Sequence, residues 1–433
     1  MTEKKSILHS NGVNYILPFI LITSCFALWG FANDITNPMV KAFSKIFRMS
    51  VTDGTLVQVA FYGGYFAMAF PAAMFIRRFS YKAGVMMGLG LYAVGAFLFY
   101  PAMLTGAYYP FLIAYFILTC GLSFLETSCN PYILSMGSED TATQRLNLAQ
   151  SFNPVGSLLG MWVAMTFIQA RLNPLESDAR ASLSDAEFEA VRDADLSILI
   201  TPYLIIGAVV LLMLALIWMM KMPKNGDKSH DVHFLASIRR IFSLVRYREG
   251  VVAQFFYVGA QIMCWTFIIQ YGTRIFMAEG MDEKAAEVLS QKFNIIAMII
   301  FCCSRFVCTF LLRFINAGKL LATLATAAAL LTIGVMAFQD RTGMYCLVAV
   351  SACMSLMFPT IYGIALNGLG DDAKFGAAGL IMAILGGSVL PPLQARIIDC
   401  GTIFGYPAVN LSFVLPLICF IVIVIYGSRR ARN

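Results

Sequence analysis

Charge is scarce in this sequence. Only 13% of its 433 residues are Asp, Glu, Lys or Arg, against about 25% in ordinary soluble domains. The three histidines all lie in polar segments, and the eleven cysteines show neither metal nor disulfide spacing. The sequence also has no Walker A loop and no G-x-S-x-G motif. These absences exclude an ordinary soluble domain, and they predict no enzyme activity, cofactor or metal.

Long hydrophobic runs take the place of charge. A membrane-spanning helix needs about 20 mostly apolar residues, and no signal peptide is expected because the polar first dozen residues precede an apolar run that is too long. The sequence predicts an all-α membrane protein with twelve transmembrane helices, near residues 14–40, 54–76, 83–101, 108–136, 144–169, 197–220, 250–273, 287–312, 318–338, 343–368, 375–398 and 404–427.

The basic residues indicate topology. The formal net charge of +7 would suit nucleic acid, but Lys and Arg are spread over many loops and are not gathered on one face. More of them fall on the side that holds both termini, which predicts that both termini are cytoplasmic. We therefore expect a lipid bilayer as the surroundings and no nucleic acid as a partner.

Two polar interruptions divide the chain. Residues 170–196 are acidic, whereas residues 222–248 are basic and follow the sixth span. The second interruption predicts an N-terminal six-helix bundle over 1–221, a cytoplasmic linker over 222–248 and a C-terminal six-helix bundle over 249–433. Transporters of this organisation bind substrate between the bundles near the membrane midplane.

Two acids lie inside predicted spans. A charged side chain in a bilayer core costs roughly 3 kcal/mol, so Asp34 and Glu126 are candidates for function. Each precedes an Asn-Pro pair, at Asn37 and at Asn130. Burial favours the neutral form of a carboxyl group, and no histidine lies in a span. We therefore predict that Glu126 and Asp34 carry a coupled proton.

Amide side chains accompany these acids in spans 1, 4 and 5. Gln150 and Asn153 are three residues apart and so share one face of a helix. Amides beside a carboxylate offer the donors and acceptors that a polyhydroxylated ligand needs, although amides also join neighbouring membrane helices by hydrogen bonds. The predicted sugar contacts here are Asn33, Asn37, Asn130, Gln150 and Asn153.

The second half adds further candidates. Gln254 and Gln261 are seven residues apart on one face of span 7 and are predicted to bind sugar. Trp265 can stack on the apolar face of a sugar, although aromatic residues in spans also serve packing or interfacial belts. Arg305 is a base inside a span; it either snorkels or pairs with a carbonyl, or it takes part in binding or coupling.

The sequence also resembles a known family. The strings FALWGFAND, QVAFYGGYF, LETSCNPY and RLNLAQSFNPVG are similar to those of the L-fucose:proton symporters of the major facilitator superfamily. The resemblance runs nearly end to end. It implies a monomeric transporter of the bacterial inner membrane that moves L-fucose with a proton by alternating access. By the same resemblance Glu126 is the essential membrane glutamate, and Gln150 and Asn153 are sugar contacts.

Span 1 departs from the family pattern. The second essential acid of the family aligns with Asn37, while Asp34 lies one helical turn earlier. Asp34 replaces that acid, or the coupling chemistry differs. The alternatives are a facilitative uniporter, a symporter for another hexose such as galactose or glucose, and a membrane sugar sensor. A membrane enzyme would need a catalytic cluster at an aqueous edge, which the sequence does not show.

Overall fold

The computed structural model describes residues 9–10, 13–36, 39–49, 56–175, 180, 182–221, 234–403 and 405–431. Within these ranges, twelve helical stretches are long and apolar enough to cross a membrane, which confirms the predicted number of spans and the all-α class. The chain forms two compact units. The first comprises residues 1–136 and 152–234, and the second comprises residues 137–151 and 235–433.

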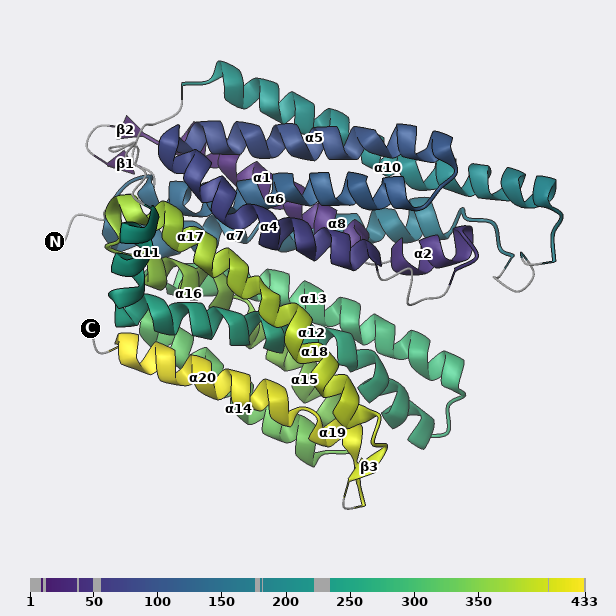
Figure 1. Cartoon of the computed structure of the whole chain (residues 1–433). Helices are drawn as coiled ribbons and strands as arrows, with labels where there is room; N and C mark the ends of the chain where they lie inside the picture. Colours follow the sequence, from purple (N-terminus) through teal and green to yellow (C-terminus); the bar gives the residue numbers. More distant parts are fainter. Residues whose placement is uncertain are drawn as a thin grey trace. The chain divides into compact units, whose positions relative to one another are not determined.

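The first unit is built almost entirely of helices, which lie side by side in Figure 1. A two-residue antiparallel pair of strands, β1 (His9–Ser10) and β2 (Val13–Asn14), precedes them. The helices are α1 (Ile16–Thr36), α2 (Met39–Ile46), α4 (Leu56–Arg78), α5 (Tyr81–Thr105), α6 (Tyr109–Ser135), α8 (Asn153–Val163), the π-helix η2 (Ala164–Gln169) and α10 (Asp185–Met219).

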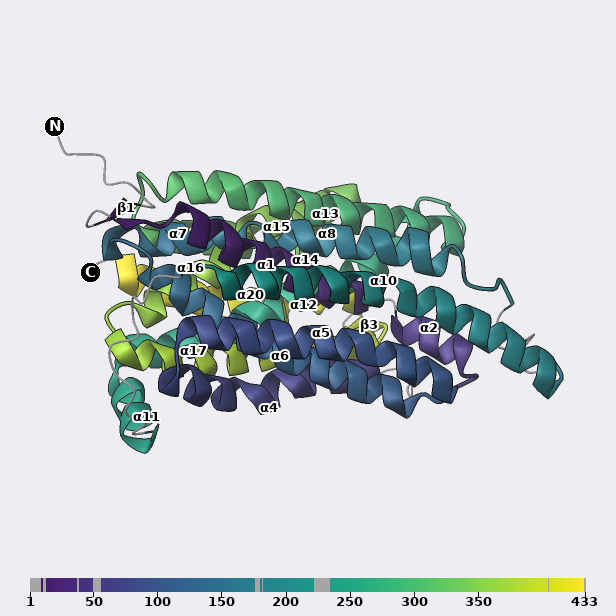
Figure 2. The ribbon, with the colours of Figure 1, turned by 90° about the horizontal axis from the view of Figure 1, so that it is seen from above.

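Small residues let these helices approach closely. Helix α6 packs against α4 and α5, and α5 also packs against α10 (Figure 2). Helix α1 packs against α8, where a Cβ atom on Gly156 would come within 1.9 Å of the Ala27 carbonyl oxygen. Close backbone contact replaces the hydrophobic driving force that is weak between helices in lipid.

Helix α10 begins earlier than the predicted span near 197–220. Its first residue is Asp185, because Ser184 caps the helix and forms a capping box with Glu187. At 35 residues the helix is roughly 50 Å long, whereas a bilayer core is about 30 Å thick. The first turns of α10, which belong to the acidic segment, therefore extend beyond the length that a span needs.

The second unit contains the remaining elements. They are the 3-10 helix η1 (Glu139–Thr141), α7 (Ala142–Gln150), α11 (Phe234–Ser243), α12 (Val245–Ala278), α13 (Glu283–Leu311), α14 (Ala317–Ala337), α15 (Arg341–Met354), α16 (Met357–Leu366), η3 (Gly370–Asp372), α17 (Ala373–Met382), η4 (Ala383–Leu385), α18 (Gly386–Ile398), β3 (Thr402–Ile403), β4 (Tyr406–Pro407), α19 (Ala408–Leu411) and α20 (Val414–Ala431). Strands β3 and β4 pair antiparallel.

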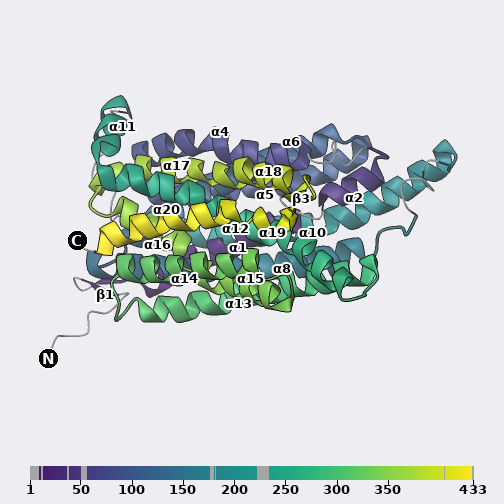
Figure 3. The ribbon, with the colours of Figure 1, turned by 90° about the horizontal axis from the view of Figure 1, so that it is seen from below.

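Helix α12 is central to the second unit. It packs against α13, α16, α18 and α20, and α20 also packs against α14 (Figure 3). A hydrophobic core made largely by α12, α13, α14, α15 and α20 joins these helices. Two of the expected spans in this unit are interrupted: α15 and α16 are separated by Ser355 and Leu356, and α17 and α18 by the 3-10 helix η4.

Residues 137–151 belong to the second unit although they precede the basic linker by seventy residues and more. Helix α7 explains this assignment. Gln144 Nε2 donates to the Thr309 carbonyl at 3.2 Å, and Asn147 Nδ2 donates to Thr360 Oγ1 at 3.1 Å. Gln144, Asn147 and Ser151 share one face of a helix, so a polar face fixes α7 to α13 and α16.

Candidate functional site

Glu126 lies in the middle of α6 and is buried, with 6% of its surface exposed. The helix around it is also buried, from Leu118 to Ile133. A carboxyl group in such surroundings needs a hydrogen-bond partner, because an unpaired buried charge is far more costly than a paired one. A hydrogen-bond donor to the Glu126 carboxyl group is therefore expected on a neighbouring helix.

Two local features bring α4 to α6 at this level. A Cβ atom on Gly64 would lie 2.1 Å from Thr119 Oγ1, so only glycine allows the two helices to approach this closely. Ser123 Oγ then donates to the Tyr65 carbonyl at 3.1 Å. Ser123 and Glu126 are three residues apart on one face of α6, which places the Tyr65 side chain beside the carboxyl group.

Tyr65 is the partner of Glu126. Its hydroxyl donates to Glu126 Oε1 at 3.2 Å and lies 3.4 Å from Asn33 Oδ1 on α1. A phenol has one hydrogen to donate, so the two acceptors compete for it. The arrangement connects α1, α4 and α6 through a single hydroxyl group. Tyr65 was not among the predicted site residues, because aromatic side chains in spans usually serve packing.

Asp34 is half-buried on α1, next to Asn33. Tyr62 and Tyr65 are three residues apart on α4, so one face of this helix carries two phenols. Asn37, the other candidate on span 1, lies outside the described residues.

The two remaining asparagine candidates of the first unit, Asn130 and Asn153, bind backbone carbonyls. Asn130 Nδ2 donates to the Glu126 carbonyl at 2.9 Å, one turn earlier on α6. Asn153 is half-buried, and its Nδ2 donates to the Phe26 carbonyl at 3.2 Å, which joins α8 to α1. Both amides thus contribute to helix structure.

The other predicted contacts lie in the second unit. Gln150 is the last residue of α7 and is buried. Trp265 is half-buried; its Nε1 donates to Ser351 Oγ at 3.2 Å, and its ring meets Phe301 edge-on at 4.9 Å between centroids. Gln261 is half-buried on the same helix, α12.

Gln254 differs from the other amides. It is fully buried, and neither its oxygen nor its nitrogen has a hydrogen-bond partner among the described residues. A buried polar group without a partner costs about 1 to 3 kcal/mol. Such a group in a native structure requires an explanation, and a ligand that supplies the missing hydrogen bonds is one.

Arg305 is held by carbonyl groups. Its Nε donates to the Ser355 carbonyl and its Nη1 donates to the Gln150 carbonyl at 3.0 Å. Its guanidinium also lies 4.5 Å from the centre of the Phe301 ring. The carbonyl pairing named as one sequence-based alternative is therefore what the structure shows.

Twelve candidate spans among the described residues, with a buried carboxyl and phenol between them, are what a membrane transporter for a polar solute requires. Comparison with known proteins gives the family. The model of the Major Facilitator Superfamily matches residues 22–392, and this chain belongs to that superfamily.

Individual relatives match over nearly the whole chain. The L-fucose-proton symporter of Haemophilus influenzae is 51% identical over 421 residues, which are 96% of each chain. The glucose/galactose transporter of Brucella abortus is 31% identical over 96% of this chain and 95% of its own length. Among solved structures, that of the transporter FucP in the outward conformation has a TM-score of 0.86 and 34% identity, covering 96% of this chain and 99% of that one.

Proposed function

We propose that this protein imports L-fucose together with a proton. The observation that carries the proton coupling is the hydrogen bond between Tyr65 and the buried Glu126. It is supported by the similarity to an L-fucose-proton symporter over nearly the full length. We further propose that the protein works as a monomer in a bacterial inner membrane, with both termini in the cytoplasm.

The geometry around Tyr65 explains how a proton can be sensed. When Glu126 is ionised, it accepts the Tyr65 hydrogen. When Glu126 binds a proton, its own O–H can donate to the Tyr65 oxygen, and the Tyr65 hydrogen is then free to turn toward Asn33 Oδ1, 3.4 Å away. Uptake of a proton on α6 thereby changes the hydrogen bonding of α1. We propose that Asp34, adjacent to Asn33, shares this role.

Neutralisation of Glu126 permits the conformational change. A bare carboxylate disfavours any conformation that removes it from water, whereas the protonated form does not. A proton and a sugar that bind from outside together allow the change to the inward-open state, where both leave. For the sugar contacts we retain the predicted residues Asn33, Asn37, Asn130, Gln150, Asn153, Gln254, Gln261 and Trp265, each to be tested through the KM of uptake.

Sugar-driven alkalinisation tests the function. Cells that express the protein are suspended in weakly buffered medium without a proton gradient, and L-fucose is added. Symport predicts that the external pH rises as protons enter with the sugar. Uptake of labelled L-fucose without a pH change would instead indicate a uniporter, and binding without uptake would indicate a sensor.

The substrate is tested in the same cells. D-Arabinose, L-galactose, D-galactose and D-glucose compete with labelled L-fucose, and each is also tested for alkalinisation. The glucose/galactose relative is the reason for including the last two hexoses. Stronger competition by D-galactose or D-glucose than by unlabelled L-fucose would overturn the assignment of the sugar while leaving proton symport intact.

Tyr65→Phe tests the proposed proton sensing. The variant keeps the ring and removes the hydroxyl, so Glu126 loses its donor and Asn33 loses its link to α6. We expect the pH dependence of L-fucose uptake to shift, with a change in KM of about tenfold or less, the size of one hydrogen bond. Tyr92→Phe on α5, which removes a buried hydroxyl that donates to the Leu28 carbonyl at 3.1 Å, is the matched control. An unchanged pH profile in Tyr65→Phe would contradict the proposed role.

A further inference from the structure

Arg305 poses a problem of charge compensation. It is 3% exposed within α13, and a guanidinium stays charged in proteins. No Asp or Glu within the described ranges forms an ion pair with it. Its hydrogen bonds go to the backbone carbonyls of Gln150 and Ser355. These two carbonyls lie 205 positions apart in the sequence, so the question is what they share.

Both carbonyls lack their helical donor for the same reason. In an α-helix the N–H of residue i donates to the carbonyl of residue i−4. The residue four positions after Gln150 is Pro154, and the residue four positions after Ser355 is Pro359. Proline has no N–H, so neither carbonyl can receive its regular hydrogen bond. Arg305 donates to both of them.

The two sites are also alike in their secondary structure. Helix α7 ends at Gln150, and α15 ends at Met354, immediately before Ser355. The C-terminus of a helix carries a partial negative charge, which a cation stabilises. Two helix ends that converge on one guanidinium therefore supply both hydrogen-bond acceptors and a favourable potential. This explains how a buried arginine is stable here without a carboxylate.

The contacts of Arg305 fix the end of α7. The polar face of α7 is already joined to α13 and α16 through Gln144 and Asn147. Arg305 adds the contact at the last residue, Gln150, whose amide is one of the proposed sugar contacts. The backbone position of Gln150 decides where its amide is presented.

We propose that Arg305 is a positioning residue for the sugar site, which replaces the two N–H groups that Pro154 and Pro359 lack and so fixes Gln150. The proposal rests on the proposed function for its transport readout. Its structural part, the substitution of an arginine for two missing backbone donors, can be tested without any substrate.

The test uses the prolines to replace the arginine. In Arg305→Met the two carbonyls lose their donors, and we expect the KM for L-fucose uptake to rise about tenfold or more, with a smaller change in the maximal rate. Adding Pro154→Ala restores an N–H four residues after Gln150. We expect this second change to lower the raised KM by at least about threefold, which corresponds to the lower range of one hydrogen bond.

Two further variants complete the comparison. Pro359→Ala restores the donor for the Ser355 carbonyl but leaves the Gln150 carbonyl without one. It should therefore lower the raised KM less than Pro154→Ala does. Pro101→Ala on α5 is the matched control: it restores an N–H for Phe97, whose carbonyl Arg305 does not contact, and should recover nothing. Equal recovery by Pro101→Ala and Pro154→Ala, or no recovery by Pro154→Ala, would overturn the proposal.

Hydrogen exchange provides the substrate-free readout. Arg305→Met should speed amide exchange in peptides that cover 142–151 and 350–360, but not in peptides within 81–105, and Pro154→Ala should reverse the effect at 142–151. If Arg305→Met does not fold, Arg305→Lys is used, which keeps the charge but cannot span both carbonyls and should raise KM to a smaller extent. Normal exchange at 142–151 in these variants would refute the inference. Failure of wild-type L-fucose uptake with the expected exchange would refute only the proposed function.

Discussion

Glu126 in the first unit and Arg305 in the second are both buried inside membrane spans, yet their partners differ in kind. Glu126 faces a neutral phenol that can donate or accept, whereas Arg305 faces two carbonyls that can only accept. The first arrangement tolerates both protonation states of the acid. The second stabilises only the charged state of the base. The comparison teaches that each buried group has partners that suit its own chemistry: a carboxyl group that can exchange a proton has a partner that donates or accepts, and a guanidinium that stays charged has acceptors only.

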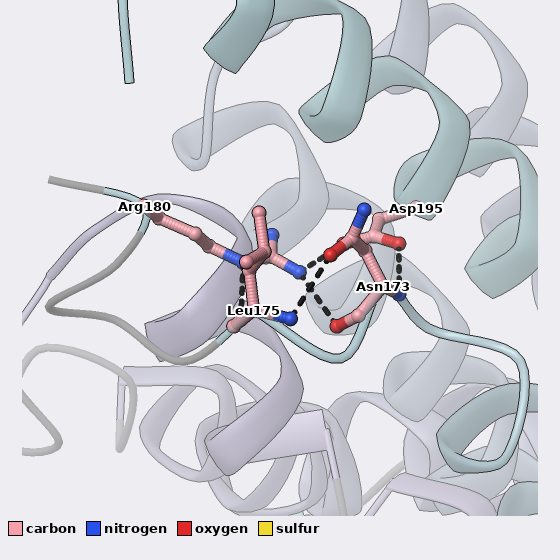
Figure 4. Close-up of polar contacts among 4 residues, drawn as sticks. All are labelled: Asn173, Leu175, Arg180 and Asp195. Atoms are coloured by element: carbon pink, nitrogen blue, oxygen red, sulfur yellow. Dashed lines mark hydrogen bonds and ion pairs between the residues drawn. The ribbon is translucent and has the colours of Figure 1, made fainter. Parts of the chain in front are cut away.

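A buried ion pair in the first unit follows the familiar pattern. Arg180 and Asp195 are both fully buried and form an ion pair at 2.6 Å (Figure 4). Arg180 also donates to the carbonyls of Asn173 and Leu175, and Asp195 accepts from the Asn173 N–H at 2.8 Å. This pair links Asn173, Leu175 and Arg180 to Asp195 on α10. Arg180 is thus compensated by a carboxylate, whereas Arg305 is compensated by backbone carbonyls alone.

The largest effect is expected from breaking the ion pair of Arg180 and Asp195. Arg180→Met leaves Asp195 as an uncompensated buried charge, which should lower the free energy of unfolding by about 3 to 5 kcal/mol. Thermal unfolding of the purified protein in detergent measures the loss. The double variant with Asp195→Leu should recover most of it, since neither charge is then left alone. Arg305→Met should cost less, because it leaves carbonyls and no charge without a partner.

The next largest effect is expected at Glu126, which can exchange a proton, in contrast to Arg305, which stays charged. Glu126→Gln keeps the size of the side chain and removes the proton. One proton moving through 100 mV supplies about 2.3 kcal/mol, which corresponds to an accumulation ratio of about fiftyfold. We expect Glu126→Gln to lose that accumulation in vesicles with an imposed gradient, while exchange of labelled for unlabelled sugar continues. Undiminished accumulation would show that Glu126 does not carry the proton.

A smaller effect is expected at Gln254, whose buried amide has no hydrogen-bond partner among the described residues, in contrast to Arg305. Replacing the unpaired amide by Gln254→Met should raise the free energy of unfolding by about 1 kcal/mol without sugar and should raise the KM for L-fucose. Opposite changes in stability and affinity are the signature of a group kept for a ligand. Gln261→Met on the half-buried position is the control and should not stabilise. Loss of stability in Gln254→Met would contradict the interpretation.

The smallest effect concerns an ion pair at the surface. Arg341 donates to Glu279 directly after α12, and this hydrogen bond lowers the pKa of Glu279. A lowered pKa in the folded state stabilises the protein above the ordinary glutamate pKa, and the contribution is lost as the pH falls through the lowered value. Wild type and Arg341→Gln should therefore differ slightly in unfolding temperature at pH 7, and this difference should disappear in strong acid. A difference that persists there would point to packing.

Hydropathy predicted the number of spans because each helix in lipid must satisfy its own backbone and carry an apolar surface. The beginning of α10 at Asp185 could have been predicted as well, since the capping box of Ser184 and Glu187 is a local signal. The assignment of residues 137–151 to the second unit could not, because α7 makes the decisive hydrogen bonds with Thr309 and Thr360, which lie far along the chain.

The sequence by itself determined the twelve spans, the presence of a buried acid at Glu126, and the two carbonyls that Pro154 and Pro359 leave without donors. Each of these depends on residues within a few turns of one helix. Only the tertiary structure decided that Tyr65 meets Glu126 and that Arg305 supplies both missing donors. The physical reason is that a hydrogen bond between helices depends on the approach of two backbones, which glycines such as Gly64 permit but which no local pattern specifies.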